Sequence, residues 1–171
     1  IQPSGEKCFN HIVMDSYVHA ATSFTGRMKE SWSFGKVTAQ YIVDHHKEID
    51  FVYNDGWQLF GLYIVAKVCV KYNIPYIVPV QDIYPESLLT KIPNICGSHA
   101  LVKMMFGWMD KFYQEHAAKV RTITDGMANY LATTRKVKME NYLAVANWQN
   151  DEEFDDYKTS FRKNGKTVFM F

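Results

Sequence analysis

Polar side chains follow each of five segments that we predict as β-strands, and their types suit a polyhydroxylated ligand. They are carboxylates, carboxamides and one hydroxyl: Asp15, Asn54, Asp55, Gln81, Asp82, Thr124, Asp125 and Asn147. The carboxyl ends of parallel strands meet at one edge of a sheet, where open α/β folds bind their ligands. Such a ligand needs many hydrogen bonds at fixed positions, and these groups can donate and accept them. The sequence therefore predicts a polar binding site along this edge.

The strongest candidates for catalytic residues are Asp82 and Glu86. Residues 74–80 are apolar and rich in β-branched side chains, which predicts a strand covered on both faces, and Asp82 lies two residues after its end. A helix cap is less obviously needed at Asp82, which favours a functional role there. For Glu86, a structural role in the first turn of a helix is an equal alternative.

Five further residues are predicted to bind the substrate: Asp55, Tyr84, Thr124, Asp125 and Asn147. Tyr84 could stack on a sugar face or pack inside the protein. Asp55 and Asp125 each precede a predicted helix, so capping that helix is the alternative role for both. No metal site is predicted, because the adjacent His45 and His46 point about 100° apart on a helix.

Strands and helices alternate along the sequence. Strands are predicted at residues 9–15, 50–55, 74–80, 120–123 and 141–146, and helices at 32–48, 57–72, 99–118 and 127–134, with a loop at 16–31 and a helical turn at 86–90. This order predicts an α/β fold with a doubly wound, mainly parallel sheet, right-handed crossovers and helices on both faces.

The helix predicted at residues 99–118 has an apolar stripe made of Leu101, Met104, Met105, Trp108, Met109 and Phe112. The simplest interpretation is that this stripe faces the core, which assigns Asp110 and Gln114 to other faces. Because Lys103 and Lys111 lie beside the stripe, contact with a membrane surface is the alternative.

Composition predicts one globular domain over residues 1–150. The chain has 171 residues, is 47% hydrophobic and carries a net charge of +1, which gives no signal for a nucleic-acid partner. Its three cysteines are widely spaced, as in a cytosolic protein with reduced thiols. The most apolar run, residues 59–70, is too short to cross a bilayer.

Residues 151–171 differ in composition, with an acidic run followed by a strand-like segment. We interpret them as a linker and the first strand of a further domain, and an edge strand of the same sheet is the alternative.

Three motifs follow one another between residues 74 and 148. The first is an apolar strand followed by Asp-Ile-Tyr-Pro-Glu at residues 82–86. The second is a strand, a turn and a helix that ends in Tyr-Leu, with the turn and helix at residues 124–131. The third is a strand that ends in Asn-Trp at residues 147–148. Over roughly residues 35–171, the chain resembles the N-terminal domain of family 4 glycosyltransferases. It is most similar to the bacterial branch that builds capsular, O-antigen or exopolysaccharide chains.

This resemblance implies half of a GT-B architecture, in which two Rossmann-like domains face each other across a cleft. It implies transfer from a nucleotide-sugar donor to a saccharide or lipid-linked acceptor, with retention at the anomeric carbon and with no obligatory metal or cofactor. Residues 1–150 would mainly bind the acceptor, and a C-terminal domain absent from this sequence would bind most of the donor. It also implies a cytoplasmic protein that contacts the inner face of the cytoplasmic membrane peripherally. We expect this segment alone to have little or no transferase activity.

In that setting Asp82 would lie beside the reacting sugar, where it could orient the acceptor hydroxyl or stabilise positive charge that develops on the donor. Two features differ from the family pattern. Nothing before Phe9 resembles the usual first strand and Gly-rich loop, and many relatives carry a histidine near the position of Asp82. Two other interpretations stay open: a non-catalytic sugar- or nucleotide-binding module of the same fold, and a two-domain sugar-nucleotide epimerase.

Overall fold

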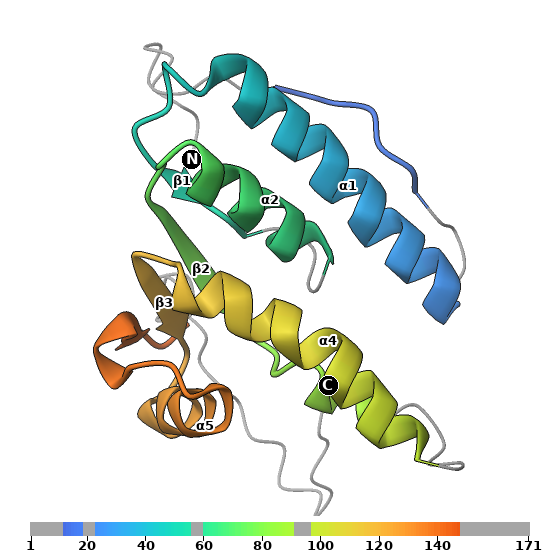
Figure 1. The fold of residues 1–171 in the computed structure, drawn as a ribbon, viewed down its shortest axis with the longest axis vertical. Helices are drawn as coiled ribbons and strands as arrows, with labels where there is room; N and C mark the ends of the chain where they lie inside the picture. The colour runs from blue at the N-terminus through green and yellow to red at the C-terminus, as the bar shows by residue number, and fades with distance from the viewer. Residues whose placement is uncertain (1–11, 19–22, 56–59, 91–96, 148–171) are drawn as a thin grey trace, which may run out of the picture.

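The computed structural model of this chain describes residues 12–18, 23–55, 60–90 and 97–147, in which helices alternate with strands (Figure 1). The elements are α1 (Phe24–His45), β1 (Val52–Tyr53), α2 (Phe60–Lys71), β2 (Tyr76–Val80), α3 (Glu86–Leu89), α4 (Ser98–Glu115), β3 (Lys119–Thr122), α5 (Asp125–Arg135), the 3-10 helix η1 (Met139–Asn141) and β4 (Tyr142–Ala144).

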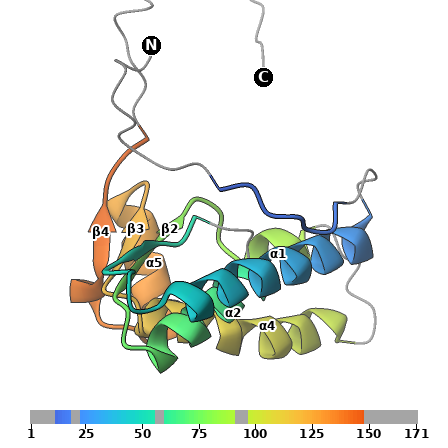
Figure 2. The ribbon, with the colours of Figure 1, turned by 90° about the horizontal axis from the view of Figure 1, so that it is seen from above.

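The four strands form one sheet in the order β1-β2-β3-β4, and every neighbouring pair is parallel. Val52 pairs with Tyr76, Ile77 with Lys119, and Val120 with Tyr142. The predicted Rossmann-like α/β class is thus confirmed. Because each strand lies beside its predecessor, right-handed crossovers place α2, α4 and α5 on the same face of the described sheet. Figure 2 shows α2 and α4 to one side of the strands.

One hydrophobic core lies between this face and the helices. Alternate side chains of β2 point into it, because Tyr76, Val78 and Val80 are almost completely buried. They pack in one cluster with Leu62 and Cys69 of α2 and with apolar residues of α4 and α5. Burial raises the pKa of the Cys69 thiol to about 11, so this cysteine behaves as a core residue.

The opposite face of the sheet carries exposed apolar side chains within the described residues. Tyr53 and Leu143 are each about half exposed, and the strand register places both on this face. We expected helices on both faces, whereas the helices that connect the described strands share a single face.

The amino-terminal part differs from the prediction in two places. Of the strand predicted at residues 9–15, the described part has no strand pairing, and Ile12 and Val13 are exposed there. Their β-branched side chains favour extended backbone, but no described strand pairs with them. The loop predicted at 16–31 is wrong from residue 24 on, because α1 begins at Phe24. Ser23 caps it by accepting a hydrogen bond from the Gly26 N–H.

The orientation of α4 is the main correction to the predicted core. Four residues of the expected core stripe are exposed, whereas Asp110 and Gln114, which we had assigned to other faces, are buried with exposures of 1% and 0%. The buried apolar residues of α4 include Phe106, Met109 and Tyr113. The Asp110 carboxylate and Gln114 Oε1 have partners, which are described below, whereas Gln114 Nε2 is buried without a described partner.

None of the helices in the described ranges is long and apolar enough to cross a membrane. The other predicted helices and strands lie within a few residues of the observed ones. The predicted linker and strand at residues 151–171 lie outside the described residues.

Candidate functional site

A hollow of about 630 Å³ lies at the carboxyl ends of β2 and β3, between α3 and α5. We call it the rim hollow. Its wall is formed by Gln81, Asp82, Ile83, Glu86, Ser87, Thr90, Ile123, Thr124, Gly126, Met127 and Tyr130. The position agrees with the general rule for ligand sites in open parallel sheets. Carboxylates, hydroxyls and an amide converge on an otherwise apolar wall, which is the composition of a site for a polar small molecule.

Asp82 is the exposed carboxylate of this hollow. It follows the last residue of β2 by two positions and lies in a bend. Among the described residues it has no hydrogen-bond or ion-pair partner, so its two oxygens can accept hydrogen bonds from ligand hydroxyls.

Glu86, in contrast, is held by protein groups. Arg135 donates from Nη1 to Glu86 Oε1 at 2.7 Å and from Nη2 to Glu86 Oε2 at 2.6 Å, which is the bidentate geometry of a strong ion pair. The Tyr130 hydroxyl also donates to Oε1, at 3.1 Å. The catalytic role of Glu86 stays a prediction. Both of its carboxylate oxygens already accept hydrogen bonds from protein groups.

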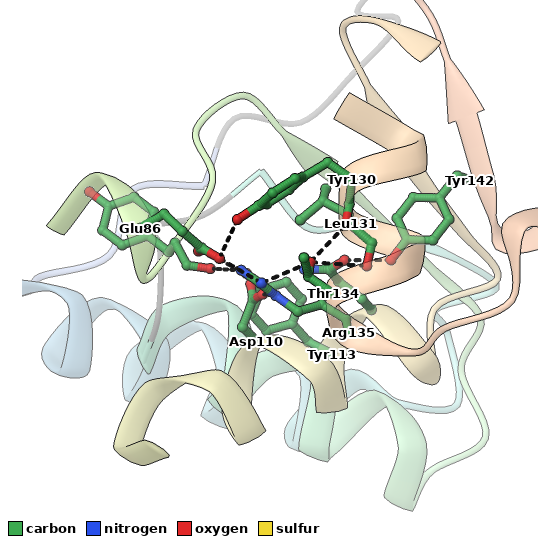
Figure 3. A network of polar contacts seen from close by, with 10 residues as sticks. Glu86, Asp110, Tyr113, Tyr130, Leu131, Thr134, Arg135 and Tyr142 are labelled. Atoms are coloured by element: carbon green, nitrogen blue, oxygen red, sulfur yellow. Dashed lines mark hydrogen bonds and ion pairs between the residues drawn. The ribbon is translucent and has the colours of Figure 1, made fainter. Parts of the chain in front are cut away.

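Arg135 connects three helices through its five N–H groups (Figure 3). Besides Glu86 of α3, it donates from Nε to Asp110 Oδ2 of α4 at 2.5 Å, and from Nη2 to the Tyr84 carbonyl at 2.5 Å. Its side chain is 8% exposed. Since Arg135 is the last residue of α5, it fixes α5 against the segment that carries Asp82 and Glu86.

The same network continues into the protein interior. The Tyr113 hydroxyl donates to Asp110 Oδ1, and the Tyr142 hydroxyl donates to Gln114 Oε1 at 2.8 Å. Four elements, α3, α4, α5 and β4, are therefore joined by buried polar contacts. Such a network specifies one arrangement of the elements around the hollow, because each buried group would be costly without its partner.

The two carboxyl groups of this network have pKa values shifted in opposite directions. Burial alone would raise the pKa of Glu86, but the hydrogen bonds and charge of Arg135 outweigh it and lower the pKa. For Asp110, burial dominates and raises the pKa, although Arg135 and Tyr113 oppose the shift. Burial disfavours charge on Arg135 as well, but its two carboxylate partners raise its pKa further. Glu86 thus stays ionised at neutral pH and is unsuited to donate a proton.

Thr124, which follows the last residue of β3 by two positions, also lines the hollow. Its side-chain oxygen accepts a hydrogen bond from the Met127 N–H at 3.1 Å, so Thr124 is the N-cap of α5. We had given the alternative capping role to Asp125, and this assignment is wrong. Asp125 is the first residue of α5, where a carboxylate favours the positive end of the helix, and it does not line the hollow. The Thr124 hydroxyl still has its proton to donate to a ligand.

Three other predicted residues lie away from the hollow wall. Asp55 is exposed after β1, and Asn147 accepts a hydrogen bond from Arg121 Nη2 at 3.0 Å. Tyr84 is half-buried and packs on the small cluster of Leu88, Phe106 and Met109, which favours the packing alternative. Of the substrate-binding predictions, only Thr124 lines the hollow.

Three residues of the site were missed. Tyr130 is 43% exposed on the hollow wall, Ser87 Oγ is buried beside it without a described partner, and Arg135 joins the network. Tyr130 lies in the helix predicted at 127–134 and Arg135 directly follows its predicted end, and no sequence pattern shows that their partner is Glu86. Within the described ranges, no group of three or more His, Cys, Asp or Glu side chains could hold a metal ion.

Comparisons with known proteins give no relative. No family model, no curated protein and no solved structure matches this chain. Within the described residues the chain forms a four-stranded parallel sheet with interleaved helices and a polar hollow at the carboxyl edge of the sheet.

Proposed function

We propose that this chain is the acceptor-side domain of a retaining glycosyltransferase. In this reaction the bond between the anomeric carbon of the donor sugar and the nucleoside diphosphate breaks. A new bond forms between that carbon and an acceptor hydroxyl oxygen on the same face of the sugar, and the hydroxyl proton leaves with the diphosphate. The acceptor is a saccharide, which can be lipid-linked, in the synthesis of a cell-surface polysaccharide.

The observation that carries this proposal is the rim hollow. Its polar groups are carboxylate, carboxamide and hydroxyl, which suit a neutral, polyhydroxylated ligand. None of the described residues of its wall is a lysine or an arginine, so these residues offer no side-chain cation for a phosphate or carboxylate. This composition favours the acceptor sugar over the charged nucleotide sugar, and it agrees with the division of roles between two domains that the sequence motifs imply.

Asp82 is the residue we place beside the reacting centre. Its carboxylate is exposed at the hollow and can accept a hydrogen bond from the acceptor hydroxyl that attacks. A negative charge at this place also stabilises positive charge that develops at the anomeric carbon. Thr124, which also lines the hollow, can donate to a ring or hydroxyl oxygen of the sugar.

Glu86 and Tyr130 have a positioning role in this proposal. Because Arg135 keeps Glu86 ionised and fully hydrogen-bonded, Glu86 holds the Tyr130 hydroxyl in place. The Tyr130 ring forms part of the hollow wall, where an aromatic face can stack on a sugar.

The experiment is a titration of the ¹⁵N-labelled chain with neutral oligosaccharides, nucleoside diphosphates and nucleotide sugars, followed by amide chemical shifts. We expect oligosaccharides to shift amides of residues that line the hollow, among them Asp82, Ser87 and Thr124. Tighter binding of a nucleoside diphosphate at these residues would favour a non-catalytic nucleotide-binding module. Robust sugar transfer by this chain alone would contradict the two-domain proposal.

A further inference from the structure

A second hollow, of about 420 Å³, is formed mainly by residues of α3, α4 and α5. We call it the lysine hollow, because its wall includes Lys103, Lys111 and Lys136. Glu86 and Tyr130 line both this hollow and the rim hollow, so the hydrogen bond between them belongs to the wall that the two share. The lysines line only the second hollow, which therefore has a different chemical character from the first.

The charge of the lysine hollow is mainly positive. Among the described residues, Lys103 and Lys136 have no ion-pair partner. Lys111 lies 3.9 Å from Glu115, and both side chains are more than 40% exposed, so this pair is weak. The carboxylate of the described wall is Glu86, which is already held in an ion pair at 2.6 Å. A concave surface lined by one sign of charge concentrates ions of the opposite sign.

The hydroxyl groups of this wall are already engaged with the protein (Figure 3). Thr134 Oγ1 donates to the Tyr130 carbonyl at 2.7 Å and accepts from Arg135 Nη1 at 3.0 Å. The Tyr130 hydroxyl donates to Glu86. The donors left for a ligand are thus the ammonium groups of the three lysines, which donate and cannot accept. Such groups bind the oxygens of phosphate.

Gly107 is unfavourable for the stability of α4 itself. It lies in the middle of an 18-residue helix, where alanine is the more stable residue. Close packing does not require a glycine there, because a Cβ at this position would meet nothing within 4 Å. Gly107 lies four residues from both Lys103 and Lys111, so the three positions share one face of the helix. The missing side chain keeps the space between the two lysines open.

Lys136 is likewise not the residue that its backbone favours. It directly follows α5 with φ 55° and ψ 41°, which is the left-handed conformation. Glycine or asparagine is the usual residue at such a helix end, and the other described non-glycine residue with a positive φ is Asn73. Lysine at this position costs stability, but it adds a third ammonium group to the hollow.

We propose that the lysine hollow binds the phosphate group of a small soluble ligand. Two positions of its wall, Gly107 and Lys136, depart from what stability favours, and such departures are expected at functional sites. The volume of the hollow is within the range of about 300–1,000 Å³ that small-molecule sites occupy. This inference does not depend on the proposed transfer reaction, because it concerns other side chains and a ligand of opposite chemical character.

The test is calorimetric titration of the full chain with inorganic pyrophosphate, glycerol phosphate and a neutral oligosaccharide. We expect one phosphate compound to bind per chain, with an affinity that falls as salt is added. The compound that binds more tightly tells whether the ligand is a free phosphate anion or a phosphate ester. With the ¹⁵N-labelled chain, the phosphate compounds should shift the amides of Gly107, Thr134 and Lys136, and the oligosaccharide should not.

Three substitutions of charge test the role of the lysines. Lys103→Gln/Lys111→Gln should weaken binding of the phosphate compounds about tenfold or more, because a hydrogen bond to a charged group is worth that much. Lys138→Gln is the matched control, since Lys138 is 81% exposed and lies outside the described wall, and it should bind like the parent chain. Glu115→Gln should tighten binding, because it removes the carboxylate that pairs with Lys111.

Two further variants separate binding from stability. Gly107→Met fills the open space with a good helix former, and Lys136→Gly relieves the left-handed backbone. Both should keep or raise the melting temperature of the parent chain and yet weaken binding of the phosphate compounds. A purely structural role of these positions predicts no loss of binding.

Three results would overturn the proposal. The first is that neither pyrophosphate nor glycerol phosphate binds at low salt. The second is equal affinity of Lys103→Gln/Lys111→Gln and Lys138→Gln, because binding would then depend only on net charge. The third is that the phosphate compounds shift amides of the rim hollow and leave those of Gly107, Thr134 and Lys136 unchanged.

Discussion

The buried ion pair between Arg135 and Asp110 permits a quantitative prediction for Arg135→Met. Methionine fills similar space but cannot donate, so the Asp110 carboxylate, 1% exposed, loses the charged donor that pairs with it and keeps the Tyr113 hydroxyl. Removing one partner of a buried pair leaves an uncompensated charge, which costs about 3–5 kcal/mol in the free energy of unfolding. That is a large fraction of the stability of a domain of this size.

The assay is urea unfolding followed by far-ultraviolet circular dichroism at neutral pH. Arg121→Met is the matched control, because the Arg121 guanidinium donates to Val145, Ala146 and Asn147 at an exposed position. We expect this control to cost less than about 1 kcal/mol.

A second substitution separates unpaired charge from lost packing. Adding Asp110→Asn to Arg135→Met removes the buried negative charge, so the double variant should be more stable than Arg135→Met alone. Acid should have a similar effect, because burial raises the pKa of Asp110 and protonation then neutralises the unpaired carboxyl. The reasoning is refuted if Arg135→Met costs less than about 1 kcal/mol, or if the double variant is the less stable one.

Two further predictions concern the acid range and the contact between α1 and α2. The lowered pKa of Glu86 gives stability that is present above its ordinary value of 4.5 and is lost as pH falls through the lower folded value. Glu86→Gln should therefore destabilise at pH 7 and much less near pH 3, and a pH-independent difference would contradict this. A Cβ at Gly35 would lie 3.0 Å from Gly61 Cα, so Gly35→Ala should cost about 1–3 kcal/mol in thermal unfolding. Gly107→Ala, whose Cβ meets nothing within 4 Å, should stabilise by about 0.5–1 kcal/mol, and equal effects would contradict the close approach.

The sequence predicted the centre of the sheet well because β2 is strongly apolar. The run at residues 74–80 could only be a buried strand, and a polar turn directly after it could only lie at the carboxyl edge. That reasoning placed Asp82 at the hollow. The same reasoning could not show that Asp55 and Asn147 lie outside the wall of the rim hollow. The ends of neighbouring strands lie at one edge of the sheet, but they need not line the same cavity.

Helix α4 shows where sequence reasoning fails. Periodicity identifies apolar stripes, and this helix has two, so the period alone cannot say which one faces the core. Asp110 determines which stripe of α4 is buried, because its carboxylate can contact Arg135 and Tyr113 only when it points into the protein. Those partners are contributed by a turn of the same helix and by another helix 25 residues later, so the pairing is a tertiary property.

The central claim, that Asp82 binds a sugar at the carboxyl edge of the sheet, is tested most directly by Asp82→Asn. The measurement is the dissociation constant, by calorimetry, of the oligosaccharide that shifts the hollow amides most. We predict an affinity about tenfold or more below that of the parent chain, since a hydrogen bond to a charged group is worth that much. The melting temperature should not change, because Asp82 is exposed and has no described partner. Asp44→Asn, an exposed carboxylate on α1, should bind like the parent. Equal affinities of Asp82→Asn and Asp44→Asn would contradict the claim.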